Sequence, residues 1–261
     1  MNRILQTAQL RDALQSHYTN DEIHGILQHL ADYEGDFDKQ TLLNRLLNHE
    51  PVQYITGKAY FHRYIFKVTS DTLIPRPETE ELCERILSEH GNEPKHIVDF
   101  GTGSGCIPIT LLKERPNWKG TGIDISDKAL EIARNNAETL EVSNRLEFQK
   151  GDILKLNILP RADIWISNPP YISNQEKSSL SNHVHIHEPH TALFAGDDPL
   201  IFYKKMASLF SAQNQIGEFW FEINQYLWEE TISVFSSLNL IAKKIEDFSG
   251  NPRFLKVYKP Y

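Results

Sequence analysis

The stretch Ala162-Asp-Ile-Trp-Ile-Ser-Asn168-Pro-Pro-Tyr171 decides the fold of this chain. Its first six residues are a short apolar run, which predicts a buried parallel strand. The strand must stop at Asn168, because Pro169 and Pro170 carry no backbone N–H that could continue a sheet or a helix. We therefore expect the Asn168 side chain and the Pro169 carbonyl to be exposed at the carboxyl end of a parallel sheet. In open α/β sheets this edge binds ligands.

These residues have a specific chemistry. The Asn168 side-chain oxygen and the Pro169 carbonyl are two neighbouring acceptors that could hold an NH2 group. Tyr171 supplies an aromatic face for a planar group to lie against. The stretch thus predicts a site for an amide or for an exocyclic amine of a base. Taken alone, it also fits a strand that ends in a polyproline turn with a structural Asn.

A second motif, residues 96–105, predicts a buried strand followed by three glycines that open a helix. Glycine adopts the unusual dihedrals of such a turn and lets a ligand approach bare backbone. The pattern alone fits a nicotinamide dehydrogenase, a methyltransferase or merely a tight turn. Asp124 ends the next predicted strand about 20 residues later, where an acidic side chain can bind a ribose diol. Asp152 and Ile153 follow a third strand and would lie near an adenine.

Composition narrows the class of protein. The chain has 261 residues, 40% of them hydrophobic, and a formal net charge of −8. An acidic surface argues against direct nucleic-acid binding. The two cysteines, Cys83 and Cys106, have no C-x-x-C spacing, which suits a reducing compartment. No signal-peptide core and no apolar run long enough for a membrane span is present, so we expect a soluble, cytoplasmic protein.

The chain divides into three segments. Residues 1–50 carry helical patterns, including a capping box from Thr19 to Glu22, and predict a small helical bundle. From Val52 to Leu73 the pattern changes to β, with Gly57 as a turn, which predicts a hairpin linker over residues 51–75. The remainder, residues 76–261, alternates predicted strands and helices, as α/β domains do.

The order of the motifs resembles the Rossmann-like methyltransferases that use S-adenosylmethionine. The matching residues are Asp99-x-Gly101-Thr102-Gly103-Ser104-Gly105, then Asp124, then Asn168-Pro-Pro-Tyr171. Ile74-Pro-Arg-Pro-Glu-Thr-Glu80 narrows the resemblance to the release-factor glutamine methyltransferases, the PrmC/HemK family. Further matches reach Asp247-Phe-Ser-Gly-Asn-Pro-Arg253, so the resemblance covers nearly the whole chain.

The resemblance implies a fold and a cofactor. The fold is α/β: a Rossmann-like S-adenosylmethionine-dependent methyltransferase domain over residues 76–261, preceded by an all-helical domain and a β-hairpin linker. The expected cofactor-binding residues are Gly101, Thr102, Gly103, Ser104, Gly105, Asp124, Ile153 and Asn168.

The resemblance also implies a reaction. The substrate is the glutamine of the Gly-Gly-Gln motif of class-1 peptide chain release factors, methylated on its side-chain nitrogen N5, which tunes translation termination. Asn168, Pro169, Pro170 and Tyr171 are expected to bind this glutamine, and Asn168, Pro169 and Tyr171 to act in catalysis. We expect the N-terminal bundle to recognise the protein substrate and the enzyme to be a monomer.

The histidines of the segment His183-Val-His185-Ile-His187-Glu-Pro-His190 could suggest a metal site, because alternate residues of an extended segment point to one side. Zinc needs three or four converging ligands, however, and methyl transfer needs no metal. We therefore expect a polar loop beside the active site and no metal.

Three other functions stay open at this point. The enzyme could methylate a glutamine of a ribosomal protein, or the N6 amine of adenine in DNA or RNA, which is also a planar NH2 group. Base flipping normally needs a basic groove, and no run of Lys or Arg here exceeds two residues. A non-catalytic adaptor would be expected to have lost the glycines or Asn168, and all of these are present.

Overall fold

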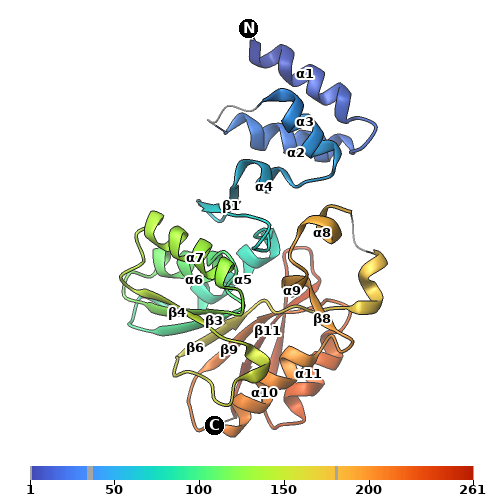
Figure 1. Cartoon of the computed structure of the whole chain (residues 1–261). Coiled ribbons are helices and arrows are strands. Elements are labelled where there is room, and N and C mark those ends of the chain that lie inside the picture. The colour runs from blue at the N-terminus through green and yellow to red at the C-terminus, as the bar shows by residue number, and fades with distance from the viewer. Residues whose placement is uncertain (1, 34–37, 180–181, 261) are drawn as a thin grey trace.

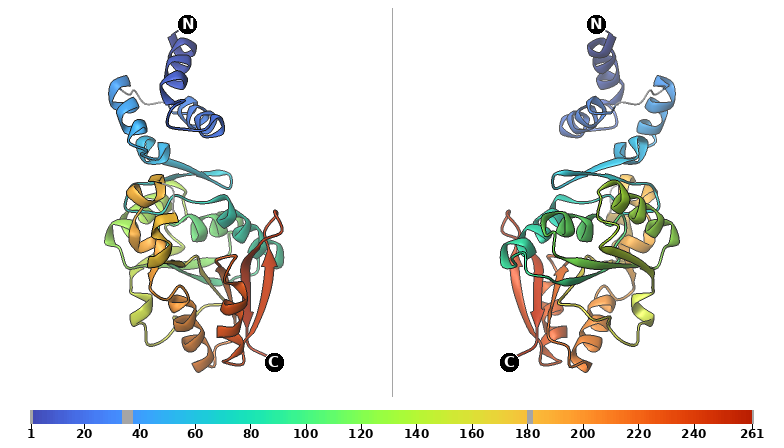
Figure 2. Two further views of the ribbon diagram at one scale, coloured as in Figure 1. Left: turned by 90° about the vertical axis from the view of Figure 1, so that its right-hand side faces the viewer. Right: turned by 90° about the vertical axis from the view of Figure 1, so that its left-hand side faces the viewer.

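The computed structural model describes residues 2–33, 38–179 and 182–260. A small helical bundle stands at one end of a larger α/β body (Figure 1). Two further views show the same elongated arrangement, with the N-terminus at the far end of the bundle (Figure 2). The bundle contains α1 (Asn2–Leu14), α2 (Asn20–Ala31), α3 (Lys39–Leu47) and α4 (Val52–Thr56).

The bundle forms as the sequence predicts. The predicted capping box begins α2: Glu22 N donates to Thr19 Oγ1 at 3.3 Å and Thr19 N donates to the Glu22 carboxylate at 2.7 Å. These bonds satisfy amides that the first turn of a helix leaves unpaired. The apolar faces of the helices meet in a core of their own, built from Leu14, Tyr18, Ile23, Ile26, Leu46, Val52 and Ile55.

The prediction of β structure from Val52 onward is wrong for the first five residues. Residues Val52–Thr56 form helix α4, which follows Pro51 and ends at Gly57 in the left-handed conformation, with φ +69°. A run of five residues is too short for periodicity to separate a strand from one buried turn of helix. The hairpin itself is present as β1 (Lys58–Phe61) and β2 (Tyr64–Lys67), paired antiparallel.

The centre of the α/β body is a seven-stranded sheet in the order β10-β11-β9-β6-β3-β4-β5. The strands are β3 (His96–Phe100), β4 (Lys119–Asp124), β5 (Leu146–Lys150), β6 (Ile164–Ser167), β9 (Glu218–Glu222), β10 (Ile241–Glu246) and β11 (Pro252–Tyr258). The five strands from β9 to β5 are parallel, and β11 pairs antiparallel with both β9 and β10. The predicted α/β class is confirmed.

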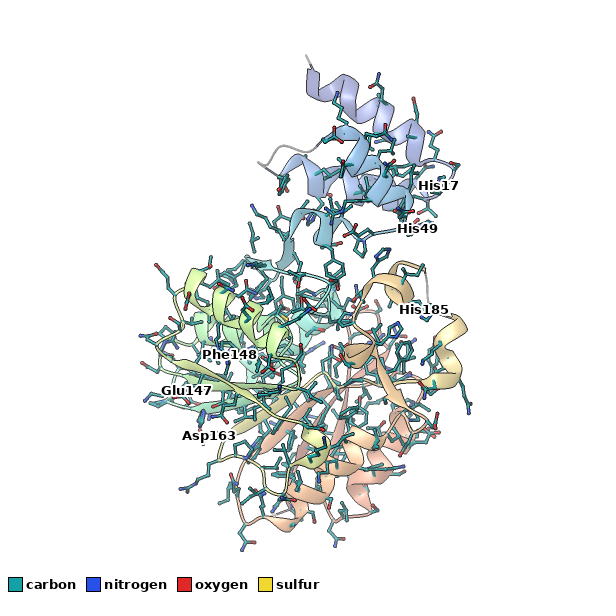
Figure 3. All side chains as sticks on the ribbon, in the orientation of Figure 1. His17, His49, Glu147, Phe148, Asp163 and His185 are labelled. Carbon is teal, nitrogen blue, oxygen red and sulfur yellow. The ribbon has the colours of Figure 1, made fainter. Side chains whose placement is uncertain are left out.

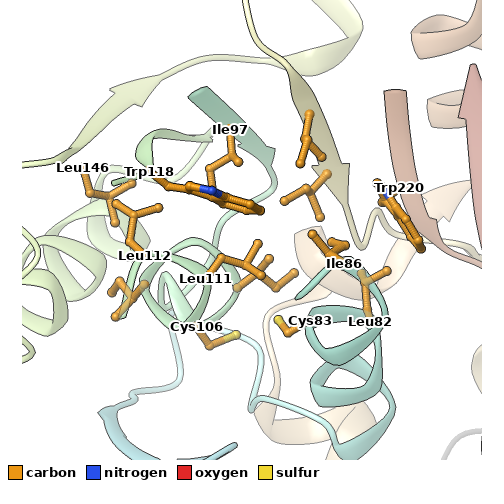
Figure 4. Packing of buried hydrophobic residues seen from close by; sticks show 14 of the residues in the cluster. Leu82, Cys83, Ile86, Ile97, Cys106, Leu111, Leu112, Trp118, Leu146 and Trp220 are labelled. Carbon is orange, nitrogen blue, oxygen red and sulfur yellow. The ribbon is translucent and has the colours of Figure 1, made fainter. Parts of the chain in front are cut away.

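Alternate residues of the central strands pack into two separate hydrophobic cores, one on each face of the sheet. In β6, Ile164 and Ile166 pack toward α5 (Pro77–Glu89) and α6 (Cys106–Glu114), whereas Trp165 packs toward α10 (Ile201–Ala212). Because successive side chains of a strand point to opposite faces, a buried strand must be apolar throughout. Figure 4 shows the first of these cores, where Leu111, Leu112 and Trp118 surround Ile97.

The remaining elements surround the carboxyl edge of the sheet or cover its faces. They are α7 (Asp127–Thr139), η1 (Ile153–Lys155), β7 (Ile172–Ser173), η2 (Asn174–Ser179), α8 (Asn182–His187), α9 (His190–Leu193), β8 (Phe194–Gly196) and α11 (Trp228–Ser236). From β3 the chain adds β4 and β5 on one side and then returns to place β6 on the other. This change of direction leaves a crevice at the carboxyl ends of β3 and β6, the usual ligand site of such sheets. No helix in the described part of the chain is long and apolar enough to cross a membrane.

Candidate active site

The glycine-rich loop connects β3 to α6. Gly101, Gly103 and Gly105 all have positive φ, at +74°, +53° and +80°. A Cβ on Gly101 would meet no protein atom within 4 Å, so this backbone faces open space. A Cβ on Gly105 would instead lie 2.9 Å from Ile109 Cδ1, so that glycine lets the helix pack closely. The two positions therefore need glycine for different reasons: access for a ligand and packing of the fold.

Asp124 at the end of β4 is held by the glycine loop. Gly103 N donates to its Oδ2 and Ser126 N donates to its Oδ1, both at 2.9 Å. Burial raises the pKa of Asp124, and the amide hydrogen bonds oppose that shift. Each carboxylate oxygen keeps a free lone pair, so the side chain can still accept hydrogen bonds from a ribose diol.

A cavity of about 300 Å³ lies between the loop and the end of β6. Of the residues predicted from the sequence to bind a cofactor, Gly101, Gly103, Asp124, Ile153 and Asn168 line it. Thr102, Ser104 and Gly105 are not among the described residues that line this cavity. The side chains of Thr102 and Ser104 are buried. Sequence reasoning did not identify the rest of the wall, which includes Asp71, Leu73, Thr191, Ala192, Phe194 and Phe202.

Asp99 lies below the loop at the end of β3 and is fully buried. The hydroxyl of Thr102, which lies in the glycine loop, is close to its carboxyl group. Burial raises the pKa of Asp99 to about 7; the Thr102 hydroxyl opposes this shift, and the nearby Asp124 carboxylate adds to it. Burying a carboxyl group this completely is costly, and such groups concentrate at functional sites.

Asn168 follows β6 directly and is half-buried, as the sequence predicts for the end of the strand. Pro169 is buried as a whole residue. The exposure of its carbonyl stays a prediction. Asn168 Nδ2 donates to Thr79 Oγ1 at 3.2 Å. The Asn168 side chain therefore has a fixed neighbour on helix α5, contributed from 89 residues earlier in the chain.

A second cavity of about 150 Å³ lies on the other side of Asn168. A cavity of this size holds a molecule as large as benzene. Its wall includes Tyr171, Arg76 and Glu222, and Asn168 is shared with the larger cavity. Burial, with a smaller effect of Glu222, raises the pKa of Tyr171, so its phenol stays neutral.

The histidine segment lies in helices α8 and α9, which corrects the expectation of a polar loop. His185 and His187 lie on α8, where residues two apart do not face the same side. His187 Nε2 lies 2.9 Å from the carbonyl of Asn48, and His190 Nε2 lies 2.9 Å from the carbonyl of His185. The His183 side chain lies outside the described residues. In the described part of the chain, no three metal-ligating side chains come together.

These contacts connect the bundle to the α/β body. Figure 3 shows His185 on α8 and His49 at the base of the bundle above it. The His187 contact with Asn48 joins the same two parts of the chain. The histidine segment is therefore part of the interface between the bundle and the α/β body.

Comparison with known proteins identifies the family. The release factor glutamine methyltransferase of Bacteroides thetaiotaomicron is 35% identical over 98% of this chain and 99% of its own length. The enzyme of the same name from Flavobacterium psychrophilum is 42% identical over 84% of this chain and 79% of its own length. This chain belongs to the release factor glutamine methyltransferase family. The family resemblance predicted from the sequence is thus confirmed.

Residues 92–221 also match a family model described as a methyltransferase domain. Among solved structures, the hMettl16 catalytic domain in complex with MAT2A 3′UTR hairpin 6 aligns with a TM-score of 0.58, over 75% of each chain. The two sequences are only 15% identical, so this likeness shows the fold alone. The predicted Rossmann-like methyltransferase fold is confirmed by both findings.

Proposed function

We propose that this protein transfers a methyl group from S-adenosylmethionine to the side-chain nitrogen N5 of the glutamine in the Gly-Gly-Gln motif of class-1 peptide chain release factors. Family membership supports the reaction and the substrate class. The structural observation that carries the proposal is the position of Asn168, whose side chain lines both cavities. A donor in the larger cavity and an acceptor amide in the smaller one would meet at this residue.

The larger cavity fits S-adenosylmethionine. Asp71, Asp124 and Asp152 place three carboxyl groups on its wall, which suits a cofactor with a sulfonium and an ammonium group. Asp124 would hold the ribose diol and Ile153 would pack against the adenine, while Gly101 gives the cofactor access to the backbone. When bound, S-adenosylmethionine supplies a methyl group on a positively charged sulfur.

The protein's part in the reaction is to orient the acceptor. An amide nitrogen is a weak nucleophile, because its lone pair is delocalised into the carbonyl group. The Asn168 side-chain oxygen and the Pro169 carbonyl accept its two N–H bonds, which fixes the amide plane and directs the nitrogen at the methyl carbon. These acceptors also stabilise the positive charge that develops on the nitrogen.

The transfer balances without a protein nucleophile. A carbon–nitrogen bond forms as the carbon–sulfur bond breaks, and the nitrogen then loses one proton to water. Tyr171 packs along the glutamine side chain as a neutral phenol. Asn168 and Tyr171 line the smaller cavity, which supports their proposed roles. The role of Pro169 rests on the family resemblance alone.

The N-terminal segment has a role in the same proposal. Residues 1–50 would recognise the release factor, residues 51–75 would act as the linker, and residues 76–261 would carry out methyl transfer. A protein substrate would explain why a separate bundle with its own core stands at one end of the α/β body. We further propose that the enzyme acts as a monomer in the cytoplasm, which size-exclusion chromatography with light scattering and cell fractionation would test.

The deciding experiment supplies S-adenosylmethionine with a deuterated methyl group and a class-1 release factor, followed by peptide mass spectrometry. We expect one labelled methyl on the glutamine of Gly-Gly-Gln, and none on a release factor whose motif glutamine is replaced by alanine. Ribosomal proteins, DNA and RNA are offered in parallel. Label on one of these alone would overturn the substrate class, and no label anywhere would overturn the proposed activity.

A further inference from the structure

Two buried side chains, those of Thr79 and Glu222, form a chain of hydrogen bonds that starts at Asn168. The Asn168 Nδ2 amide donates to Thr79 Oγ1 at 3.2 Å, and the Thr79 hydroxyl donates to Glu222 Oε2 at 2.7 Å. Thr79 lies in the first turn of α5 and is 3% exposed. Glu222 is the last residue of β9 and is 2% exposed. The chain of hydrogen bonds thus connects the Asn168 side chain to two rigid elements.

The Asn168 carboxamide, the Thr79 hydroxyl and the Glu222 carboxylate differ in which of them can donate, and this sets the donor and acceptor of each bond. An ionised carboxylate can only accept, so the single hydroxyl hydrogen of Thr79 is directed to Glu222. The Thr79 oxygen can then only accept from Asn168. If the Asn168 carboxamide turned over, its oxygen would face a hydroxyl oxygen with no hydrogen to give, which is repulsive in a buried site. The bonds therefore keep the Asn168 nitrogen inward and leave its oxygen free for a ligand.

We propose that Thr79 and Glu222 are positioning residues that fix the orientation of the Asn168 carboxamide, and that the charge on Glu222 decides which Asn168 atom faces the acceptor. This inference rests on the proposed function, in which the Asn168 oxygen receives an N–H from the acceptor amide. Neither residue touches the reacting atoms. Both act through Asn168.

Protonation of Glu222 reverses the direction. A protonated Glu222 donates to the Thr79 oxygen, and the Thr79 hydroxyl hydrogen is then free to turn toward Asn168. The favourable partner for that hydrogen is the Asn168 oxygen, so the carboxamide turns over. Its NH2 group would face the acceptor amide, where it cannot accept an N–H. The low-pH form should consequently be inactive.

The environment of the Glu222 carboxyl group brings its protonation close to neutral pH. Burial raises the pKa of Glu222 to about 7, while the hydrogen bond from Thr79 opposes that shift. Tyr203 fixes the backbone here, because its hydroxyl donates to the Glu222 carbonyl at 2.9 Å. The charged and titratable groups that face the Glu222 carboxyl come from several elements: Arg76, Glu78, Cys83, Tyr171, Tyr203 and Arg253.

The test measures kcat, KM and cofactor affinity across about pH 5.5 to 8.5, the range in which such a carboxyl group titrates. Thr79→Val should lower kcat by about 10- to 100-fold, as loss of a supporting hydrogen bond does. Its cofactor Kd should change much less, and Thr79→Ser should restore kcat because the hydroxyl returns. Glu222→Gln is neutral at every pH, so it should lower kcat toward that of the low-pH wild type and flatten the acid limb of the pH profile.

A matched control removes an equally buried hydroxyl elsewhere. Thr231 is 1% exposed and its hydroxyl donates to the carbonyl of Leu227, the residue before α11, at 2.6 Å. Thr231→Val should leave kcat and the pH profile as in the wild type. Three results would each overturn the inference: kcat of Thr79→Val within twofold of wild type, failure of Thr79→Ser to restore kcat, or an unchanged acid limb in Glu222→Gln.

A substrate-free measurement separates this inference from the proposed function. If the wild type does not methylate a release factor, the function fails, and the side-chain 15N amide resonance of Asn168 still reports its hydrogen bonding. We expect that resonance to titrate near pH 7 in the wild type and to lose the transition in Glu222→Gln and Thr79→Val. A resonance independent of pH in the wild type would overturn the inference.

Discussion

The guanidinium of Arg76 donates to the Glu188 carboxylate at 2.5 Å, and only 1% of the Glu188 side chain is exposed. The other Glu188 oxygen accepts from the backbone of Ile74 at 3.4 Å. These bonds tie the segment before α5 to the segment after α8. Both segments contribute to the wall of the smaller cavity, so this pair shapes the proposed acceptor site.

Replacement of Arg76 by Ala should be strongly destabilising. It leaves the buried Glu188 carboxylate without its partner, a change that costs about 3 kcal/mol of unfolding free energy. Urea denaturation measures the loss. The control is Arg63→Ala, because the Arg63 side chain is 68% exposed and its ion pair with Glu114 lies at the surface. That variant should lose less than about 1 kcal/mol, and equal losses in the two variants would contradict the importance of the buried pair.

Gly101→Ala should weaken cofactor binding without unfolding the protein. The residue has φ +74°, and its new methyl group would point into open space at the larger cavity. We expect the Kd for S-adenosylmethionine, measured by calorimetry, to rise at least tenfold. Gly57→Ala is a matched control, because Gly57 has φ +69° and equally open surroundings, but lies outside that cavity. An equal effect in the control would assign the loss to backbone strain alone.

The sequence predicted the carboxyl edge of the sheet well, because strong local signals mark each strand end there. Glycines follow β3, Asp124 ends β4 and two prolines come soon after β6, and parallel strands bring these ends to one edge. Thr79, Glu188 and Glu222 carry no such local signal. Their partners lie 89 to 143 residues away in the chain, so only the folded structure shows the hydrogen bonds and the ion pair that they form.

Helix α4 shows a different limit of secondary-structure prediction from the sequence. Val52, Tyr54 and Ile55 are all buried in the structure, yet their order fits a strand as well as a turn of helix. The choice is made by tertiary packing: Val52 and Ile55 complete the core of the bundle, while Tyr54 donates to the Thr72 carbonyl at 2.6 Å. Local propensity is too weak to predict an element whose partners lie on both sides of a domain boundary.

Asn168→Ala should separate catalysis from cofactor binding. The variant removes the acceptor oxygen but leaves the glycine loop and Asp124, which form most of the contacts proposed for the cofactor. We expect kcat to fall by about 100-fold or more, as loss of a group that orients the reacting atoms does. The Kd for S-adenosylmethionine should change by less than about fivefold, the equivalent of roughly 1 kcal/mol. A loss confined to cofactor affinity would refute the orienting role of Asn168.

Asp99 should make stability fall as the pH rises toward neutral. Burial raises its pKa to about 7, so the folded protein holds a proton that the unfolded chain releases at lower pH. This contribution is fully present below about pH 4, the ordinary pKa of Asp, and is lost as the pH rises through about 7. Wild-type unfolding free energies from urea titrations of the cofactor-free protein should therefore decline between about pH 5 and 7, by up to about 1.4 kcal/mol per pH unit for one proton. Asp99→Asn removes the titrating group and should show a shallower decline, and a variant with the wild-type slope would contradict the assignment.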